Sequence, residues 1–312
     1  MSGLVSVIVV SWNSSEAIGR CLSSVNQARY NPIEIILVDN ASRDGTVEYV
    51  RENFPEVTVV RNSENKGFSC ANNQGIRIAQ GEFILFLNAD AFISPGFLNI
   101  LIGKMENDPS IGLAGGKGYK EEGRKVIDST GIFLPSFKMG PYDRGEGEED
   151  RGQFDRTEFV FGISGACALY RRACLEDIRL GEEYFDESYF AYYEDVDLAW
   201  RAKIRGWKCL YEPKALAYHR RRGKAIKDTP LFSRAMANLY LTYLKNESGQ
   251  GLVSLGAVKM PHELGRLIIR IVFRGKGSYS PRFLESLSLS QKDLQEALRK
   301  RRLIQSWSKR RP

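Results

Sequence analysis

The chain has 312 residues, of which 43% are hydrophobic and 27% are charged, so its composition is that of a globular protein and excludes a chain disordered throughout. The five cysteines are scattered, without the close pairs of a zinc or redox motif, which predicts reduced thiols in the cytoplasm and no disulfide framework. The net charge of +7 is unevenly divided, because residues 219–312 carry 21 Lys and Arg against 6 Asp and Glu, whereas residues 1–218 carry 24 against 32.

The first ninety residues alternate between apolar runs and helical segments. Strands are predicted at Val5–Val10, Ile33–Val38, Val57–Val60 and Phe83–Leu87. The first run lacks a basic leader and a cleavage site and is short, so we expect a strand there rather than a signal peptide or membrane anchor. Successive strand–helix units predict a parallel sheet with right-handed crossovers.

Polar residues follow each predicted strand. They are Ser11, Asn13, Asp39, Asn40, Asn65, Lys66, Gly67, Asn88 and Asp90. Ligands of open α/β sheets bind beyond the carboxyl ends of the strands, so these residues predict a nucleotide site, with Asp90 as the first functional candidate. The alternative is that such loops are polar as a class and that Asn88-Ala89-Asp90 is an ordinary turn before a helix that starts at Pro95. The glycine motifs of dinucleotide-binding folds and of P-loops are missing, which disfavours a dinucleotide-binding fold and a P-loop in this chain.

Residues 117–156 are rich in glycine and charge, including Gly-Glu-Gly-Glu-Glu-Asp at 145–150. This composition predicts a mobile, poorly packed loop that is either a lid or an insertion. Order returns at Glu158–Ile163. The small residues that follow, among them Gly165 and Ala166, serve either a close ligand or close packing.

Three acids, Glu194, Asp195 and Asp197, fall in or just before the first turn of a predicted helix. They can simply cap the helix, because its dipole stabilises carboxylates there. The aromatic residues at 189, 190, 192 and 193 favour a general base instead, since an apolar setting keeps the pKa of a carboxylate from falling. His219 ends an apolar strand and is either structural, a metal ligand or a base.

Taken in order, these motifs resemble family-2 glycosyltransferases of the GT-A fold, particularly bacterial members that add rhamnose or related sugars to cell-surface polysaccharides. The matching stretches are residues 7–13, 36–46, 65–75, 85–90, 165–166, 185–187, 194–198 and 219. The resemblance implies an α/β fold with a mainly parallel central sheet flanked by helices. Residues 1–115 would form a Rossmann-like nucleotide-sugar half, 116–220 an acceptor and catalytic half, and 221–312 a basic, mostly helical extension.

The resemblance also implies roles for single residues. Asp39 would hold the base or ribose of the donor, with Ser11, Asn13, Asn40, Lys66 and Asn73 near it. Asn88-Ala89-Asp90 stands where the family has Asp-x-Asp, so Asp90 would bind Mg²⁺ or Mn²⁺ with His219 as a further ligand or diphosphate contact; Asn88 departs from the motif's first Asp. Asp195 would be the general base, with Glu194 as its substitute, and Gly165 and Ala166 would lie on the acceptor side.

The basic C-terminal part is predicted to be helical at Pro230–Lys245 and Glu263–Arg274. The second helix sets Arg266, Arg270 and Arg274 opposite an apolar stripe, which is typical of a helix at an anionic membrane surface or of one packed on its own domain. Basic clusters follow at 299–302 and 309–311. No nucleic-acid recognition module is present, so we expect no nucleic acid as a partner.

Together the residues and the resemblance predict a metal-assisted, inverting glycosyltransferase of cell-surface polysaccharide synthesis. It would move a sugar, with rhamnose as a candidate, from a dTDP- or UDP-sugar to a hydroxyl of a glycan or lipid-linked acceptor, in the cytoplasm or on the inner face of the membrane. The alternatives are a nucleotidyltransferase and a catalytically silent sugar-nucleotide-binding module.

Overall fold

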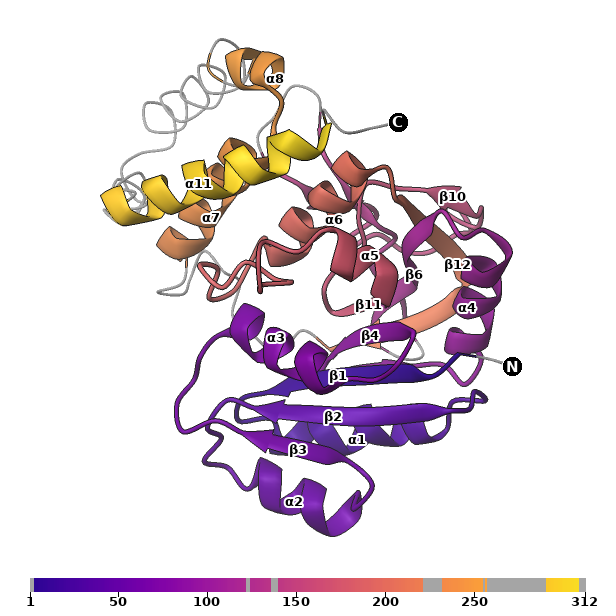
Figure 1. Ribbon diagram of the computed structural model, residues 1–312. Coiled ribbons are helices and arrows are strands. Elements are labelled where there is room, and N and C mark those ends of the chain that lie inside the picture. Colours follow the sequence, from indigo (N-terminus) through magenta and orange to yellow (C-terminus); the bar gives the residue numbers. More distant parts are fainter. Residues whose placement is uncertain are drawn as a thin grey trace, which may run out of the picture. The chain divides into compact units, whose positions relative to one another are not determined.

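The structure is a computed structural model and describes residues 3–121, 124–135, 140–220, 232–254, 256 and 290–308 (Figure 1). The chain divides into two compact units. The first comprises Met1–Phe133 and Asp143–Arg222, and the second comprises Leu134–Tyr142 and Gly223–Pro312.

The first four strands form the parallel half of the large sheet, as predicted. They are β1 (Val5–Ser11), β2 (Ile33–Asp39), β3 (Thr58–Arg61) and β4 (Phe83–Asn88), in the spatial order β4-β1-β2-β3. The helices between them are α1 (Ser15–Asn26), α2 (Thr46–Asn53) and α3 (Phe68–Ile78). Both faces of β1 are buried, because Val7 and Val9 belong to one hydrophobic core cluster and Ile8 to another.

The second half of the sheet is mixed. From β4 the order continues through β11 (Cys167–Arg171), β6 (Ile111–Glu121), β12 (Lys208–His219) and β10 (Glu158–Phe159). β11 is antiparallel to β4 and β6, whereas β12 is parallel to β6. Two further strands, β5 (Ala91–Ile93) and β7 (Arg124–Ser129), pair antiparallel with β12 and β6 respectively.

The other described elements between residues 97 and 205 are α4 (Phe97–Asn107), α5 (Arg172–Asp177), α6 (Glu194–Arg205) and a two-stranded sheet of β8 (Ile132–Phe133) and β9 (Tyr142–Asp143). α4 begins two residues after the predicted start at Pro95. α6 begins at Glu194, so all three predicted acids lie in its first turn.

The expectation of a poorly packed loop over 117–156 is wrong for the residues that the structure describes there. The Lys117 side chain is 3% exposed, and its Nζ lies 2.9 Å from Asp150 Oδ2 and also pairs with Asp155. The Tyr119 hydroxyl donates to the same Asp150 carboxylate. The charges that made the segment look unable to pack are therefore paired with each other, which composition alone does not reveal.

The second unit contains α7 (Phe232–Asn246), α8 (Gly249–Ser254) and α11 (Gln291–Ser308). Arg301 Nη1 donates to the carbonyls of Leu244 and Glu247 at 2.7 and 2.6 Å, near the end of α7. Lys300 is 3% exposed and pairs with Glu296. These two members of the 299–302 cluster therefore have partners within their own unit.

The predicted helix Glu263–Arg274 and the cluster 309–311 lie outside the described residues. Among the helices that the structure describes, none is both long and apolar enough to cross a membrane.

Candidate functional site

The strand register brings the predicted polar residues to one edge of the sheet. Ser11 is paired with Asp39 between β1 and β2, and Val10 is paired with Asn88 between β1 and β4. Ser11 Oγ donates to Asp39 Oδ1 at 2.8 Å, and the Ser42 amide donates to Oδ2 at 2.9 Å. The Asp39 residue is 0% exposed, so in this structure its carboxylate organises the loop that it begins.

Two of the predicted donor-binding residues connect neighbouring loops. Asn40 Nδ2 donates to the Gly67 carbonyl at 3.1 Å. Asn73 Nδ2 donates to the Phe185 carbonyl at 2.8 Å and to Glu187 Oε1 at 2.9 Å, and its Oδ1 accepts from the Phe185 amide at 2.8 Å. Both are buried, so their contacts place the Gly67 loop and α3 against other parts of the site.

The outer rim of this edge is formed by exposed side chains. Asn13 and Lys66 are exposed, and Trp12, between Ser11 and Asn13, is 59% exposed. Asn13 has a left-handed backbone with φ 52° and accepts from the Arg43 amide at 2.9 Å. The rim therefore offers an aromatic face, an amide and a cation beside the buried Asp39 loop.

Asp90 and His219 meet at the ends of two distant strands. β5 pairs with β12 so that His219 is opposite Ala91, the residue after Asp90. His219 Nε2 lies 3.2 Å from Asp90 Oδ1 and 3.4 Å from Asn88 Nδ2. The predicted pair is thus assembled by a strand, β5, that the sequence analysis did not predict.

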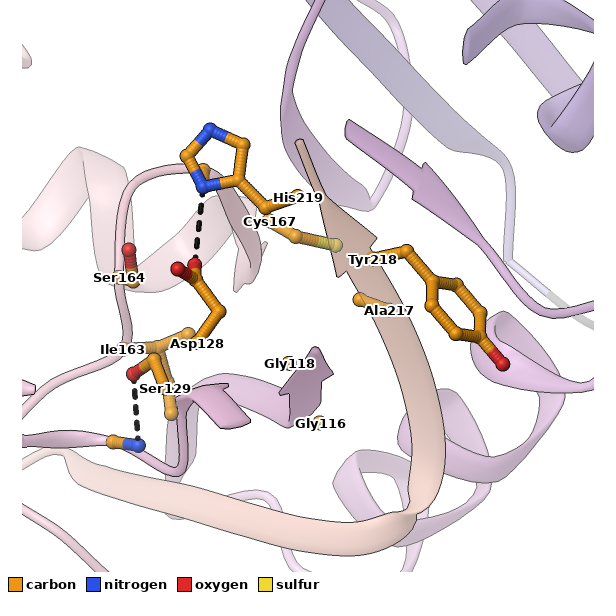
Figure 2. Close-up of a pocket in the computed structure, with 12 residues that line it drawn as sticks. Gly116, Gly118, Asp128, Ser129, Ile163, Ser164, Cys167, Ala217, Tyr218 and His219 are labelled. Carbon is orange, nitrogen blue, oxygen red and sulfur yellow. Dashed lines mark hydrogen bonds and ion pairs between the residues drawn. The ribbon is translucent and has the colours of Figure 1, made fainter. Parts of the chain in front are cut away.

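A further carboxylate lies on the other side of the imidazole. His219 Nδ1 is 3.1 Å from Asp128 Oδ2, whose side chain is 3% exposed (Figure 2). Burial lowers the pKa of His219, but the hydrogen bonds and charges of Asp128 and Asp90 outweigh it and raise that pKa from 6.5 to about 9. The ring is therefore cationic at neutral pH when only these carboxylates surround it.

The chemistry of this donor set fits a divalent cation. A carboxylate oxygen and an imidazole nitrogen face each other. The carboxylate suits Mg²⁺ or Mn²⁺, and the imidazole, once neutral, suits a transition-metal cation, so Mn²⁺ fits the pair better than Mg²⁺ does. Within the described part of the chain no group of three or more His, Cys, Asp or Glu could hold a metal. A cation held by Asp90 and His219 would need its other ligands from substrate oxygens or water, which is the usual arrangement for Mg²⁺.

The sequence analysis missed Asp128, because it lies in the segment interpreted as a lid or insertion. It lines a pocket with His219, Ser164, Ala166 and several glycines (Figure 2). At Gly116 the glycine is explained by packing, because a Cβ there would lie 1.8 Å from the Ala215 carbonyl oxygen. No signal in the sequence links Asp128 to a histidine ninety-one residues later.

Asp195 is tied to the same edge through the segment that contains Gly165 and Ala166. Its Oδ2 accepts from the Gly165 amide at 2.9 Å and its Oδ1 from the Val196 amide at 2.8 Å. The Ala166 carbonyl accepts from the Asn88 amide at 2.9 Å. Two consecutive residues thus connect the first turn of α6 with the end of β4.

Glu194 has a different environment. Its Oε2 is buried and has no hydrogen-bond partner among the described residues. Burial, followed by the charge of Asp195, raises the pKa of Glu194 from 4.5 to about 8. The two preceding residues, Tyr192 and Tyr193, have left-handed backbones with φ 74° and 71°, a conformation that costs energy and is concentrated at functional sites.

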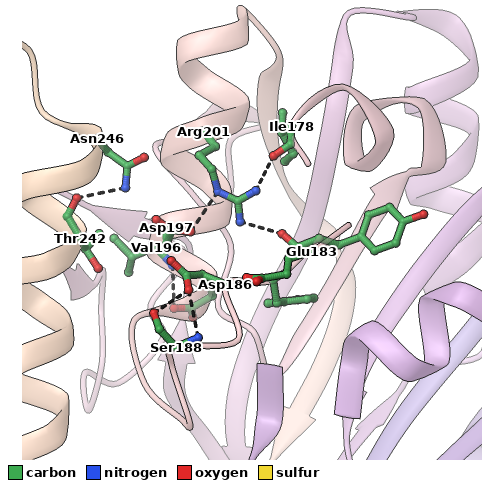
Figure 3. A network of polar contacts seen from close by, with 12 residues as sticks. Ile178, Glu183, Asp186, Ser188, Val196, Asp197, Arg201, Thr242 and Asn246 are labelled. Carbon is green, nitrogen blue, oxygen red and sulfur yellow. Dashed lines mark hydrogen bonds and ion pairs between the residues drawn. The ribbon is translucent and has the colours of Figure 1, made fainter. Parts of the chain in front are cut away.

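Asp197 is structural. It is 0% exposed and pairs with the equally buried Arg201 at 2.9 Å (Figure 3). Arg201 also donates to the carbonyls of Ile178 and Tyr184 at 2.5 and 2.8 Å. Of the three acids of the cluster, this one anchors α6 to the segment 178–184.

Residues 6–179 match the family model described as glycosyl transferase family 2. The chain belongs to glycosyl transferase family 2. A curated relative, N-acetylglucosaminyl-diphospho-decaprenol L-rhamnosyltransferase of Mycobacterium tuberculosis (strain CDC 1551 / Oshkosh), is 26% identical over 243 residues, which cover 70% of this chain and 76% of the relative.

Solved glycosyltransferase structures share the fold of this family-2 chain. S. aureus TarS 1-349 superposes with a TM-score of 0.59 at 18% identity, covering 97% of this chain and 87% of that one. The mannosyltransferase PcManGT from Pyrobaculum calidifontis, solved with GDP-Man and Mn²⁺, has a TM-score of 0.57 at 18% identity, covering 99% and 86%. The predicted family and GT-A fold are confirmed.

Proposed function

We propose that this family-2 glycosyltransferase is an inverting enzyme that transfers a sugar, with rhamnose as the leading candidate, from a nucleotide diphosphate to a hydroxyl of a lipid-linked or glycan acceptor. The observation that carries the proposal is the link from Asp195 through Gly165 and Ala166 to Asn88, which sets an acid beside the edge that holds Asp90 and His219. The name of the mycobacterial relative supports rhamnose and a diphosphate-linked lipid acceptor.

The donor would bind across the edge formed by β1, β2 and β4. The exposed side chains of Trp12, Asn13 and Lys66 would contact it directly. Asp39 lies behind them and is buried, so it would contact the base or ribose only after its loop adjusts. Ser11, Asn40 and Asn73 would act through their hydrogen bonds to that loop and its neighbours.

Asp90 and His219 would hold Mg²⁺ or Mn²⁺ when the donor is bound. Such a cation offsets the negative charge on a leaving diphosphate. Asn88, where the family has an Asp, contributes an amide near the His219 ring. The bound Mn²⁺ of the mannosyltransferase structure supports a divalent cation in this fold.

Asp195 would be the general base. The acceptor oxygen would attack the anomeric carbon while its proton passes to the Asp195 carboxylate and the bond from that carbon to the diphosphate oxygen breaks. One such displacement inverts the anomeric centre. Two backbone amides hold the carboxylate in place, so it is oriented before the acceptor arrives.

The test is replacement of the base. Asp195→Asn should lower turnover by about 10²–10⁴-fold, the usual contribution of a general base, while leaving donor affinity unchanged. Release of nucleoside diphosphate measures turnover, and Glu52→Gln, an exposed acid on α2, is the control. Near-normal turnover in Asp195→Asn would refute the assignment. Pyrophosphate release would instead indicate a nucleotidyltransferase, and donor binding without release of either product a silent module.

The donor is identified by thermal shift. A ligand that binds only the folded state raises the melting temperature by mass action, so dTDP-, UDP- and GDP-sugars should be compared with and without Mn²⁺. A shift confined to one nucleotide and dependent on Mn²⁺ supports the roles of Asp90 and His219. A shift independent of Mn²⁺ keeps the donor site and removes the metal from the proposal.

A lipid-linked acceptor would be presented at the inner face of the membrane, where the positive charge of the C-terminal part would favour anionic lipid. Co-sedimentation with vesicles of anionic and neutral lipid measures this attraction. Equal recovery with both kinds of vesicle would contradict an electrostatic contribution.

A further inference from the structure

A buried acid from the glycine- and charge-rich segment reaches the candidate cation site. Asp128 is at the end of β7, and its side chain is 3% exposed. Ser129 is paired with Gly118 on β6, and Gly118 is paired with Ala217 on β12, two residues before His219. The two strands that carry Asp128 and His219 are therefore separated by one strand.

The intervening strand has no side chain where the two residues approach each other. A Cβ at Gly118 would lie 3.3 Å from the Ser129 carbonyl oxygen and 3.8 Å from Asp128 Cβ. Asp128 Oδ2 thus comes within 3.1 Å of His219 Nδ1, a contact that Figure 2 marks with a dashed line. On the opposite side of the ring, Nε2 lies 3.2 Å from Asp90.

The strand that carries Asp128 is held by the run 145–150. Ile127 exchanges backbone hydrogen bonds with Glu148 and Gly147, both at 2.9 Å. The Asp150 amide donates to the Lys125 carbonyl at 2.6 Å, and the Asp150 side chain pairs with the buried Lys117. The polar segment is therefore a fixed support for Asp128.

We propose that Asp128 is a positioning residue of the cation site, which holds the His219 ring so that Nε2, and not Nδ1, faces Asp90 and a bound divalent cation. The inference rests on the proposed cation-binding function. A carboxylate that accepts from the distal N–H of a ligating histidine fixes its tautomer and ring orientation and increases its basicity as a ligand. Asp128 would contact neither cation nor substrate.

The first test measures Mn²⁺ binding to the full chain, with Mn²⁺ alone as the probe and electron paramagnetic resonance of free Mn²⁺ as the readout. Asp128→Ala should weaken binding about 10–100-fold, the usual effect of removing such a partner. Asp128→Asn keeps an oxygen that can accept from Nδ1 but removes the charge. Its Mn²⁺ affinity should therefore lie between that of the wild type and that of Asp128→Ala. Glu52→Gln, an exposed acid on α2 outside the run 145–150, is the control and should bind as the wild type does.

The second test needs no metal. The chain has two histidines, so His262→Gln assigns the imidazole signals of His219 in long-range ¹H–¹⁵N spectra. The hydrogen-bonded Nδ1–H signal should be present in the wild type and in Asp128→Asn and should be lost in Asp128→Ala.

The two tests separate the two proposals. An unchanged Nδ1–H signal in folded Asp128→Ala, or wild-type Mn²⁺ affinity in that variant, would overturn the role of Asp128. Absence of Mn²⁺ binding to the wild type would instead overturn the cation function, and with it Asp128 as a residue of a cation site, while the spectra would still show whether Asp128 orients the ring. If Asp128→Ala does not fold, Asp128→Asn decides: an Mn²⁺ affinity below that of the wild type would support the role of Asp128, and an affinity equal to the wild type would overturn it.

Discussion

The buried pair of Asp197 and Arg201 should be a main determinant of the stability of the first unit. Asp197→Ala removes the carboxylate beside Arg201, a pair that Figure 3 shows, and leaves a guanidinium that is 0% exposed. Among the described residues this guanidinium keeps the carbonyls of Ile178 and Tyr184 as partners. Breaking a buried pair from one side costs about 3–5 kcal/mol, because an uncompensated charge stays in the interior.

This cost translates into a large change in melting temperature. For a unit of this size, each kcal/mol lowers the melting temperature by about 2–4 °C, so Asp197→Ala should melt about 6–20 °C below the wild type. The double replacement Asp197→Leu with Arg201→Met removes both charges, and its loss should be much smaller than the sum of the single losses. Because α6 carries Asp195, turnover of the single variant should also fall at temperatures where the wild type is stable.

The measurements are calorimetry and denaturant unfolding of the two single variants and the double variant. Arg61→Ala is the control, since the pair of Arg61 with Glu48 is 45% and 62% exposed and should contribute at most about 1 kcal/mol. A loss in Asp197→Ala no larger than that in Arg61→Ala would refute the reasoning, because the buried charge would then be relieved in another way.

Two further predictions concern the loops around the site. Since the pKa of Glu194 is raised from 4.5 to about 8 in the folded chain, the native state binds more protons between these values, so the free energy of unfolding falls as pH rises through this window. Glu194→Gln should flatten that slope and be stabilising at pH 8.5, as urea unfolding at pH 5 and 8.5 would measure; an unchanged slope would contradict the buried carboxyl. Gly67→Ala should destabilise by at least about 1–3 kcal/mol, because φ 84° with ψ 170° is a conformation that glycine almost alone adopts and because a Cβ would lie 2.5 Å from the Phe190 carbonyl oxygen. Gly45→Ala should lose less, because φ 83° with ψ 8° is the left-handed helical region and nothing lies within 4 Å of a Cβ there. Equal losses in the two glycine variants would show that the loop moves to accommodate the new methyl group.

The local sequence was enough to predict the parallel half of the fold. Unbroken apolar runs such as Phe83–Leu87 are typical of strands buried on both faces, and the polar residues that end them, Asp39 and Asn88 among them, lie at one edge because parallel strands in register end together. The acids of α6 were likewise predictable, since Glu194 begins a helix with an apolar face.

Only the tertiary structure decided which polar residues meet. Asp197 and Asp195 are two residues apart, yet they have different partners. Asp197 forms a buried ion pair with Arg201, whereas Asp195 accepts a hydrogen bond from the Gly165 amide at the site. Asp128 and His219 are distant in the chain and become neighbours because β6 separates their strands. Periodicity and composition indicate the local secondary structure of a segment. Pairing between charged residues that are distant in the chain depends on the order of the strands in the sheet, which no short stretch of sequence encodes.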